Sequence, residues 1–327
     1  GITGWQAGDR VAALLAGARS GVTRDIARLI SIVEDGRPEV PELMRSVAST
    51  AGSAWVIGIT GSPGVGKSTT TSALITSLRA RGERVGVLAV DPSSPFSGGA
   101  LLGDRIRMQQ HATDDGVFIR SMASRGHLGG LAATTPQALR VFEAAGFDVV
   151  LVETVGVGQS EVEIAAAADT TLVLLAPGMG DGIQAAKAGI LEIGDVFVVN
   201  KADRDGADST VRELRAMIGL GDRPVDGWVP PVVKTVASTG VGIEDLVAAV
   251  DAHSAWLATS GELDARRLRR ARDEVEAIAV GTLRRLLRGE GQGVALDRLA
   301  ADVSAGRTDA YTAARALVDG LLDETQL

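Results

Sequence analysis

The stretch GSPGVGKST, residues 61–69, constrains the fold more than any other part of the chain. It fits the pattern G-x-x-x-x-G-K-[ST] of a phosphate-binding loop. An apolar, β-rich run (residues 55–60) stands directly before it, and a segment with apolar residues at helical spacing (residues 69–82) follows it. Because such a loop connects a strand to a helix, both flanks agree with the motif. The alternative, an ordinary glycine turn, does not require these flanks.

The residue types in this loop suit the phosphates of a nucleotide. Glycines let successive backbone N–H groups converge on phosphate oxygens, and the N-terminus of the following helix adds positive potential. Lys67 supplies a charge for the outer phosphates and Ser68 a hydroxyl for Mg²⁺. We expect all nine residues to contact the nucleotide: Gly61, Ser62, Pro63, Gly64, Val65, Gly66, Lys67, Ser68 and Thr69.

Strands and helices alternate from residue 55 to about residue 256. Several strand candidates are continuously apolar, which is typical of parallel strands covered on both faces. The candidates span residues 55–60, 84–90, 116–120, 148–153, 170–176, 195–200 and 231–237. We predict an α/β fold with a doubly wound, mostly parallel sheet. One of its helices is expected to begin with Thr135 as the cap and Pro136 in the first turn.

Helical segments flank this region. We expect an N-terminal helical arm (residues 1–53), a P-loop domain (54–259) and a C-terminal helical region (260–327). In the last region, mostly apolar residues recur at spacings of three and four along an Arg-rich helix: Leu268, Ala271, Val275, Ile278, Thr282 and Leu286. Because this seam has no obvious partner in its own region, we interpret it as a dimerisation element. The Arg run (266–272) suggests a polyanion site, but interleaved acidic residues favour a solvated helix face.

Composition excludes several functions. The 327 residues carry a formal net charge of −8, so general binding to nucleic acid or to an anionic membrane is not expected. The chain has no cysteine, which excludes disulfides and is compatible with a reducing cytosol, so we expect a cytoplasmic protein. No apolar run reaches the roughly 20 residues that span a bilayer. No signal peptide is expected, and a removed segment before Gly1 stays open.

Three acidic residues are placed to complete a Mg²⁺ site. Asp91 and Glu153 each follow an apolar strand candidate, and Asp104 lies in the stretch GGALLGDRIRM. Ligands bind at the carboxyl ends of strands in this fold class, so we predict a metal role for Asp91 and Glu153, direct or through water. For Asp104, a metal role and a helix cap explain the residue equally well.

The stretch ETVGVGQSE, which begins at Glu153, predicts a switch. The N–H of Gly156 is placed to meet a γ-phosphate and to report its loss. In Ras-like proteins a Gln follows this glycine, whereas Val157 stands here and Gln159 comes two residues later. We therefore predict catalytic roles for Lys67, Glu153 and Gln159, and leave open which side chain orients the attacking water.

The stretch NKAD, which begins at Asn200, predicts which nucleotide base the protein binds. The Asp203 carboxylate can accept hydrogen bonds from N1–H and from the exocyclic amine of guanine, a donor pair that adenine lacks. Lys201 can lie along the purine, and Asn200 can tie this stretch to the phosphate loop. Backbone N–H groups of three residues then face the guanine carbonyl oxygen: Ala237, Ser238 and Thr239. A plain turn is the alternative, but NKAD after a phosphate loop favours GTP over ATP.

The glycine-rich stretch RSMASRGHLGGLA begins at Arg120 and contains Arg125 and His127. A loop near the nucleotide or a partner, and a purely structural role, are both compatible with it. His127 has no companion metal ligands nearby in sequence, which favours a hydrogen-bonding role.

Five segments in this order resemble the MeaB/ArgK GTPases, relatives of the methylmalonic aciduria type A protein: GSPGVGKST, VDPSSPFSGGALLGDRIRM, RSMASRGHLGGLA, ETVGVGQSE and NKAD. The opening helical stretch is also similar to that family's arm. Ser97 stands where relatives often carry Thr, and a hydroxyl remains.

This resemblance implies a GTPase chaperone that couples GTP binding and hydrolysis to adenosylcobalamin loading and protection of methylmalonyl-CoA mutase. It also implies a homodimer joined through the C-terminal helices. Its residue roles agree with those above: phosphates on residues 64–69, Mg²⁺ near Ser68, Asp91, Asp104 and Glu153, and guanine on Asn200, Lys201 and Asp203.

Three other functions compete with this one. A small-molecule kinase or transport-linked ATPase is disfavoured by Asp203, which suits guanine. A metal-insertion GTPase for another client enzyme is disfavoured because the chain lacks cysteine and clustered histidine. An interaction protein with a relic site requires the motifs to persist without use.

Overall fold

A computed structural model describes the chain at residues 7–91, 111, 113–123, 131–154, 160–178, 191–220, 227–287 and 289–324. The described strands form one seven-stranded sheet in the order β3-β2-β4-β1-β5-β6-β7, and every neighbouring pair is parallel. Their bounds are β1 Trp55–Gly61, β2 Val85–Asp91, β3 Val117–Ala123, β4 Val149–Thr154, β5 Thr170–Leu175, β6 Val196–Val199 and β7 Val232–Lys234. The predicted α/β class is confirmed, and the sheet is wholly parallel.

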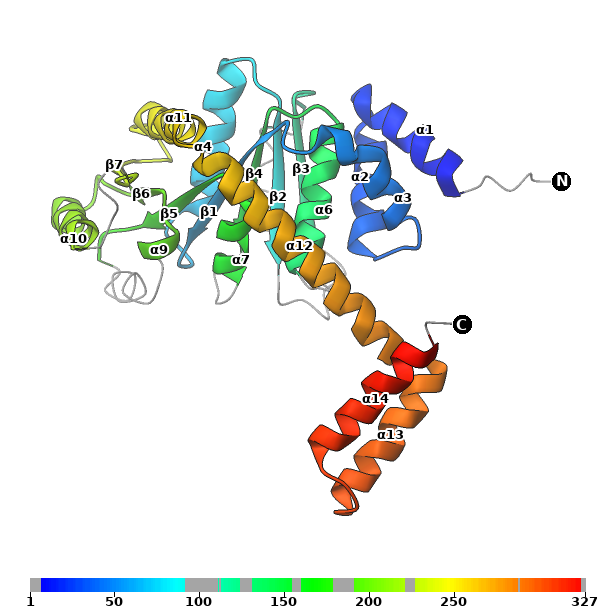
Figure 1. Cartoon of the computed structure of the whole chain (residues 1–327). Coiled ribbons are helices and arrows are strands. Elements are labelled where there is room, and N and C mark those ends of the chain that lie inside the picture. The colour runs from blue at the N-terminus through cyan, green and yellow to red at the C-terminus, as the bar shows by residue number, and fades with distance from the viewer. Residues whose placement is uncertain are drawn as a thin grey trace.

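Helices cover both faces of the sheet (Figure 1). Along β6, Val196 and Val198 point to one apolar cluster, while Phe197 and Val199 point to another, because successive side chains of a strand alternate between faces. One face is covered by α4 (Lys67–Ala80) and α11 (Ile243–Ser260). The other is covered by α6 (Leu131–Ala144), α7 (Ser160–Ala167) and α10 (Ala207–Gly219); a short helix, α9 (Leu191–Ile193), precedes β6. Both faces are apolar, which explains the continuously apolar strands.

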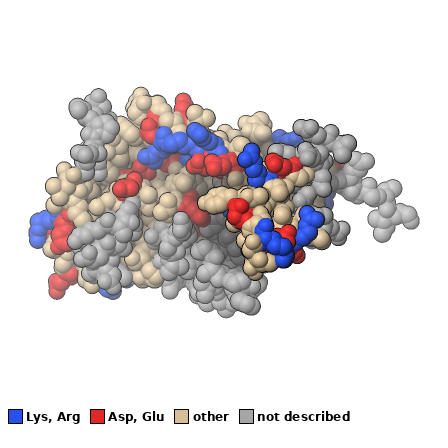
Figure 2. All heavy atoms as spheres, turned by 60° about the horizontal axis from the view of Figure 1, so that its bottom comes forward, with Lys and Arg blue, Asp and Glu red and all other residues tan. Residues whose placement is uncertain are grey.

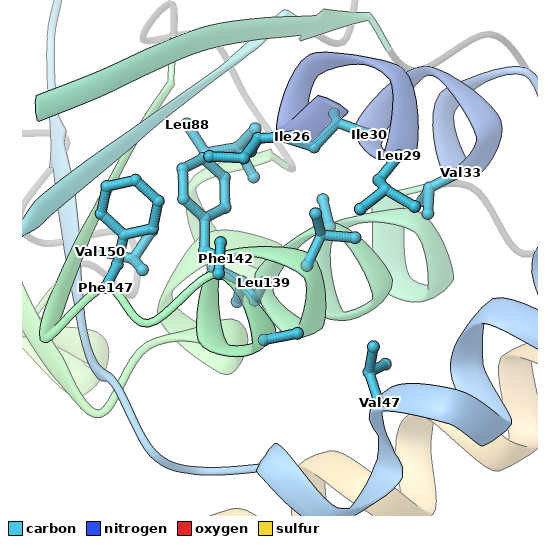
Figure 3. Close-up of a cluster of buried hydrophobic side chains, with 14 of the residues drawn as sticks. Ile26, Leu29, Ile30, Val33, Val47, Leu88, Leu139, Phe142, Phe147 and Val150 are labelled. Carbon is cyan, nitrogen blue, oxygen red and sulfur yellow. The ribbon is translucent and has the colours of Figure 1, made fainter. Parts of the chain in front are cut away.

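The N-terminal helices pack against α6. They are α1 (Ala7–Arg19), α2 (Thr23–Glu34), α3 (Val40–Val47) and the single turn η1 (Ala48–Thr50). Figure 3 shows Ile26 and Leu29 of α2 lying in one cluster with Phe142 of α6. The same cluster contains Leu88 and Val150, which belong to strands of the sheet. These helices therefore share their core with the α/β region.

The predicted start of α6 is wrong. The helix begins at Leu131, so Pro136 lies inside it. The Thr135 hydroxyl is buried and caps nothing, since it has no hydrogen-bond partner among the described residues. A proline inside a helix removes one backbone hydrogen bond. Burial of Leu139 and Phe142 against the sheet and α2 accompanies the continued helix.

The C-terminal helices extend away from the sheet. Helix α12 (Glu262–Leu287) runs past the body and leads to a hairpin of α13 (Glu290–Ser304) and α14 (Ala310–Glu324) (Figure 1). Its first half contacts residues just before β1, β5 and β6, at the edge of the sheet opposite the phosphate loop. No helix formed by the described residues is long and apolar enough to cross a membrane.

The Arg run of α12 is not a fully solvated face, because three of its arginines bind buried carboxylates. Arg267 and Arg270 bind the buried carboxylate of Asp169, and Arg266 binds that of Asp195. On the face drawn in Figure 2, acidic and basic side chains of the described residues are intermixed. The reason for the incorrect prediction is that the partners lie far away in sequence.

Candidate functional site

The predicted strand–loop–helix arrangement around residues 61–69 is confirmed. Strand β1 ends at Gly61 and helix α4 begins at Lys67. Gly64 and Gly66 both have left-handed backbones, with φ of 83° and 99°. A Cβ at Gly66 would collide with Nδ2 of Asn200, whereas one at Gly64 would meet nothing within 4 Å. Gly66 is therefore needed both for its backbone conformation and for a close approach between two loops.

Lys67 lies along the inside of this loop. Its ammonium donates to the carbonyl of Gly61 at 2.6 Å and to that of Ser62 at 3.3 Å, and the side chain is 9% exposed. Carbonyl oxygens are weaker partners for an ammonium than phosphate oxygens, since charge-assisted bonds between two ions are the stronger ones. The ammonium group of Lys67 is thus held beside the backbone of the loop.

Asn200 joins three loops. It follows β6 and is buried, and its Nδ2 donates to the carbonyl of Val65 at 2.9 Å. Its Oδ1 accepts from the Thr235 hydroxyl and from the Ala237 N–H, each at 3.1 Å. The predicted tie between NKAD and the phosphate loop is confirmed, and it extends to the segment after β7.

The other two polar residues of NKAD differ in their surroundings. Lys201 donates to the carbonyl of Gly64 at 2.6 Å, so its side chain bridges to the phosphate loop. Its φ of 56° is the only left-handed value for a non-glycine among the described residues. Asp203 is exposed and has no hydrogen-bond partner among the described residues. Its carboxylate can therefore accept hydrogen bonds from a ligand.

The turn after β7 reduces the number of predicted backbone N–H groups that can donate to guanine. Val236 and Val241 form an antiparallel bridge that closes this turn. Within it, the Ala237 N–H donates to Asn200 and the Thr239 N–H to the Val236 carbonyl at 3.0 Å. Of the three predicted donors, only the Ser238 N–H has no partner among the described residues.

A cavity of about 590 Å³ lies between helix α4 and the turn after β7. Ser68 and Thr69 line it on the phosphate-loop side, and Ala237, Ser238 and Gly240 line it on the side of the turn. Ligand pockets usually measure roughly 300–1,000 Å³. The cavity therefore has the size of a ligand pocket and borders the end of the phosphate loop and the predicted guanine turn, whereas the residues of NKAD do not line it.

The acidic residues lie at the same edge of the sheet. Glu153 is buried near the end of β4, in register with Ile59 of β1 and Ala89 of β2. Asp91 ends β2, two residues beyond Ala89, and its side chain lies outside the described residues. Asp104, Gly156 and Gln159 also lie outside them.

A family model described as "Methylmalonyl Co-A mutase-associated GTPase MeaB" matches residues 26–291. The chain belongs to the MeaB family of GTPases. The phosphate loop and the NKAD stretch (residues 200–203, hereafter the base stretch) thus lie in a chain of a GTPase family.

Relatives of this MeaB-family chain cover most of its length. A protein of Pyrococcus abyssi is 47% identical over 298 residues, which cover 90% of this chain and 92% of that protein. The GTPase ArgK of Escherichia coli is 37% identical, with 75% of this chain and 76% of that protein covered. The mouse methylmalonic aciduria type A homolog, a mitochondrial protein, is 40% identical and is matched over 64% of this chain and 52% of its own length.

Among solved structures, the LAO/AO transport system kinase superposes with a TM-score of 0.71 at 26% identity. The match covers 95% of this chain and 97% of that one. The likeness of the MeaB-family chain to this structure therefore includes both helical ends.

Sequence reasoning missed two residues in the site of this MeaB-family chain. The Thr235 hydroxyl donates to Asn200, and the Thr71 hydroxyl lies 2.7 Å from a carboxylate oxygen of Glu153. For Thr71 a signal was available, because it stands four residues after Lys67 and shares its helix face. Thr235 had no comparable signal, since its partner Asn200 is 35 residues away and follows another strand.

Arg120 has a structural role in this chain. It donates to Glu34 at 2.9 Å and to the Ser31 hydroxyl at 3.1 Å, and so ties β3 to α2. This contact supports the structural alternative for the start of its stretch. Arg125 and His127 lie outside the described residues.

Proposed function

We propose that this MeaB-family GTPase is a switch that assists adenosylcobalamin loading into methylmalonyl-CoA mutase and protects that enzyme. The description of the family model names an association with the mutase, and one relative is a methylmalonic aciduria type A homolog. The observation that carries the switch is the Asn200 side chain, which couples the base stretch to the phosphate loop. Through this contact, binding of the base at residues 200–203 is linked to the conformation of the phosphate loop.

The site residues have these proposed roles. Residues 61–69 bind the phosphates, with Lys67 on the outer ones, and Asp203 selects guanine. The Ser238 N–H, which has no partner among the described residues, faces the guanine carbonyl oxygen. Asn200 and Lys201 hold the base stretch against the phosphate loop. Ala237 and Thr239 shape the turn, because their N–H groups have intramolecular acceptors.

The donor set fits Mg²⁺. Ser68 and Glu153 offer oxygen atoms at one edge of the sheet, and the strand register brings Asp91 to the same edge. Oxygen ligands are those that Mg²⁺ prefers. We include Asp104 in this set from the sequence pattern. When bound, Mg²⁺ would neutralise charge on the phosphate oxygens.

For hydrolysis we propose Lys67, Glu153 and Gln159 as the catalytic residues. Lys67 stabilises negative charge on the phosphates. Glu153 holds the start of the segment that contains Gly156 and Gln159, so that a γ-phosphate can be sensed there. No arginine is assigned to the transferred phosphate, so we expect slow turnover without a partner.

We further propose a homodimer and three structural parts with the predicted boundaries, 1–53, 54–259 and 260–327. Every residue of the predicted seam on α12 is exposed: Leu268, Ala271, Val275, Ile278, Thr282 and Leu286. Apolar residues in such a stripe are normally covered by a partner. A second copy of the same helix provides a matching stripe.

The test is GTP turnover by the full chain, alone and with cobalamin-dependent methylmalonyl-CoA mutase. We expect binding of the mutase and a change in turnover. Lys67→Ala serves as the control, because it should abolish tight triphosphate binding. If a competent mutase neither binds nor alters turnover, the chaperone role is wrong while the GTPase activity stands.

A second candidate is a kinase linked to transport, since the LAO/AO transport system kinase has a similar structure. It predicts turnover of ATP that a small-molecule acceptor stimulates. The exposed Asp203 favours guanine instead. Comparison of GTP and ATP as substrates, each with and without a small-molecule acceptor, separates the two candidates.

A further inference from the structure

The buried hydroxyl of Thr71 lies on the carboxylate of Glu153. Thr71 Oγ1 and Glu153 Oε2 are 2.7 Å apart, and neither side chain is more than 4% exposed. Thr71 belongs to α4 and Glu153 to β4, so the contact joins the helix that follows the phosphate loop to the strand that leads into the 153–161 segment. Short hydrogen bonds to a carboxylate are among the stronger ones in proteins.

Thr71 has one proton and two acceptors within reach. Its hydroxyl is also 3.1 Å from the carbonyl of Lys67. The carboxylate is nearer and is the better acceptor when charged, so the proton belongs on the bond to Glu153. The Lys67 carbonyl, one helical turn before Thr71, is the alternative acceptor for the same proton.

We propose that Thr71 is a positioning residue that holds the Glu153 carboxylate in place relative to Lys67 and Ser68. Thr71 follows Lys67 by four residues and Ser68 by three, so the three side chains lie along one side of α4. A carboxylate held in this way is fixed on the side of the phosphate loop before any nucleotide enters. This inference rests on the proposed role of Glu153.

The chain provides a matched control in the neighbouring threonine. Thr70 is also fully buried on α4, but its hydroxyl has no hydrogen-bond partner among the described residues. Thr70→Val and Thr71→Val remove the same atoms from the same helix at the same burial. Only Thr71→Val removes a bond to Glu153.

The experiment measures GTP turnover and the affinity of a fluorescent GDP analogue, with and without Mg²⁺, for the full chain. We expect Thr71→Val to lower kcat about tenfold, with a smaller change in KM, because positioned groups act mainly in the transition state. The gain in GDP affinity on adding Mg²⁺ should fall about threefold or more, since one proposed ligand is less well held. Thr71→Ser keeps the hydroxyl and should restore both quantities. Thr70→Val should stay within about twofold of wild type.

Glu153→Gln separates this inference from the function on which it rests. If Thr71 acts through Glu153, adding Thr71→Val to Glu153→Gln should change kcat by less than about twofold. If Glu153→Gln lowers turnover but Thr71→Val does not, the positioning role is wrong and the role of Glu153 stands. If Glu153→Gln itself leaves turnover and the Mg²⁺ effect unchanged, the proposed role of Glu153 is wrong as well. Thermal unfolding of each variant checks that it is folded, and should Thr71→Val fail to fold, Thr71→Ala takes its place in every comparison.

Discussion

The guanidinium of Arg266 binds both carboxylate oxygens of Asp195, with N–O distances of 2.9 and 2.8 Å. Arg266 lies on α12, and Asp195 stands just before β6, the strand that ends at the base stretch. Oδ2 of Asp195 also accepts from the Thr171 N–H at 2.9 Å, and His253 lies 3.3 Å from Oδ1. This pair therefore attaches the helix with the exposed seam to the strand edge opposite the nucleotide site.

Removal of this attachment should destabilise the protein. Arg266→Ala leaves the buried Asp195 carboxylate without its two-point partner, and we expect a loss of about 2–3 kcal/mol in the free energy of unfolding. Arg269→Ala is the control, because Arg269 pairs with Glu262 in an exposed position and should contribute at most about 1 kcal/mol. Urea unfolding of both variants measures the difference. Equal losses would mean that the pair does not hold α12.

The same carboxylate predicts a pH dependence. Burial acts to raise the pKa of Asp195, but the adjacent His253 and the hydrogen bonds from Arg266 outweigh it, and the pKa lies below its ordinary value. The folded state thus favours the charged form. Its contribution is fully present above the unfolded pKa of about 3.9 and is lost as pH falls through the lower folded value. The stability difference between wild type and Asp195→Asn should therefore be constant above about pH 5 and shrink below about pH 4. A difference that grows on acidification would contradict this sign.

Two glycines of the phosphate loop with left-handed backbones, Gly64 and Gly66, provide another test. Gly66→Ala combines backbone strain with a collision against Asn200, whereas Gly64→Ala introduces strain alone, since its Cβ position is open. We expect Gly64→Ala to cost about 1 kcal/mol and Gly66→Ala clearly more. GTP affinity should fall further in Gly66→Ala, because displacing Asn200 disturbs both subsites. Unfolding and nucleotide titration check both variants, and the reverse order would show that Asn200 can move freely.

The preference for guanine over xanthine nucleotides tests the proposed role of Asp203. Asp203→Asn replaces an acceptor-only carboxylate by an amide that can also donate, so it should weaken GTP binding and admit xanthosine triphosphate. A loss of about tenfold or more in GTP affinity is expected. Competition titrations with the two nucleotides measure this. Unchanged GTP affinity would remove the proposed guanine contact.

The exposed seam predicts the oligomeric state. Val275 is 67% exposed on α12, and Val275→Asp places a charge at the centre of the seam. We expect a dimer for the wild type and a monomer for this variant, because an unpaired charge is costly in an apolar interface. Asp273→Asn, on another side of the same helix, should leave the dimer intact. Light scattering after size exclusion reads the mass, and a wild-type monomer at all concentrations would contradict the proposed homodimer.

The local elements of the fold could be predicted from the sequence because their signals are local. Seven apolar runs gave seven strands, and the glycine motif marked the junction of β1 and α4. The predicted helix start at Thr135 was wrong, because the helix begins at Leu131 and includes Pro136. Tertiary packing of Leu139 and Phe142 accompanies this longer helix. Local propensity is a weak signal when such packing competes with it.

The contacts between motifs needed the tertiary structure. Asn200 and Val65 are 135 residues apart, Thr71 and Glu153 are 82 apart, and Arg266 and Asp195 are 71 apart. The first of these was expected from two motifs, while each of the other two involves one residue that no motif marks, Thr71 in one pair and Asp195 in the other. The Arg run was misread for the same reason, because its carboxylate partners stand before β5 and β6.

By itself, then, the sequence determined the strands, the phosphate loop and the residue types available for guanine and a metal, since periodicity and side-chain chemistry are carried by neighbouring residues. Only the tertiary structure decided which strand lies beside which, and hence which polar groups share a hydrogen bond. The order β3-β2-β4-β1-β5-β6-β7 brings Glu153 to Thr71, just after the phosphate loop, and places Asp195 at the far edge of the sheet in contact with α12. Strand order depends on packing of the whole domain, and no single stretch of the chain encodes it.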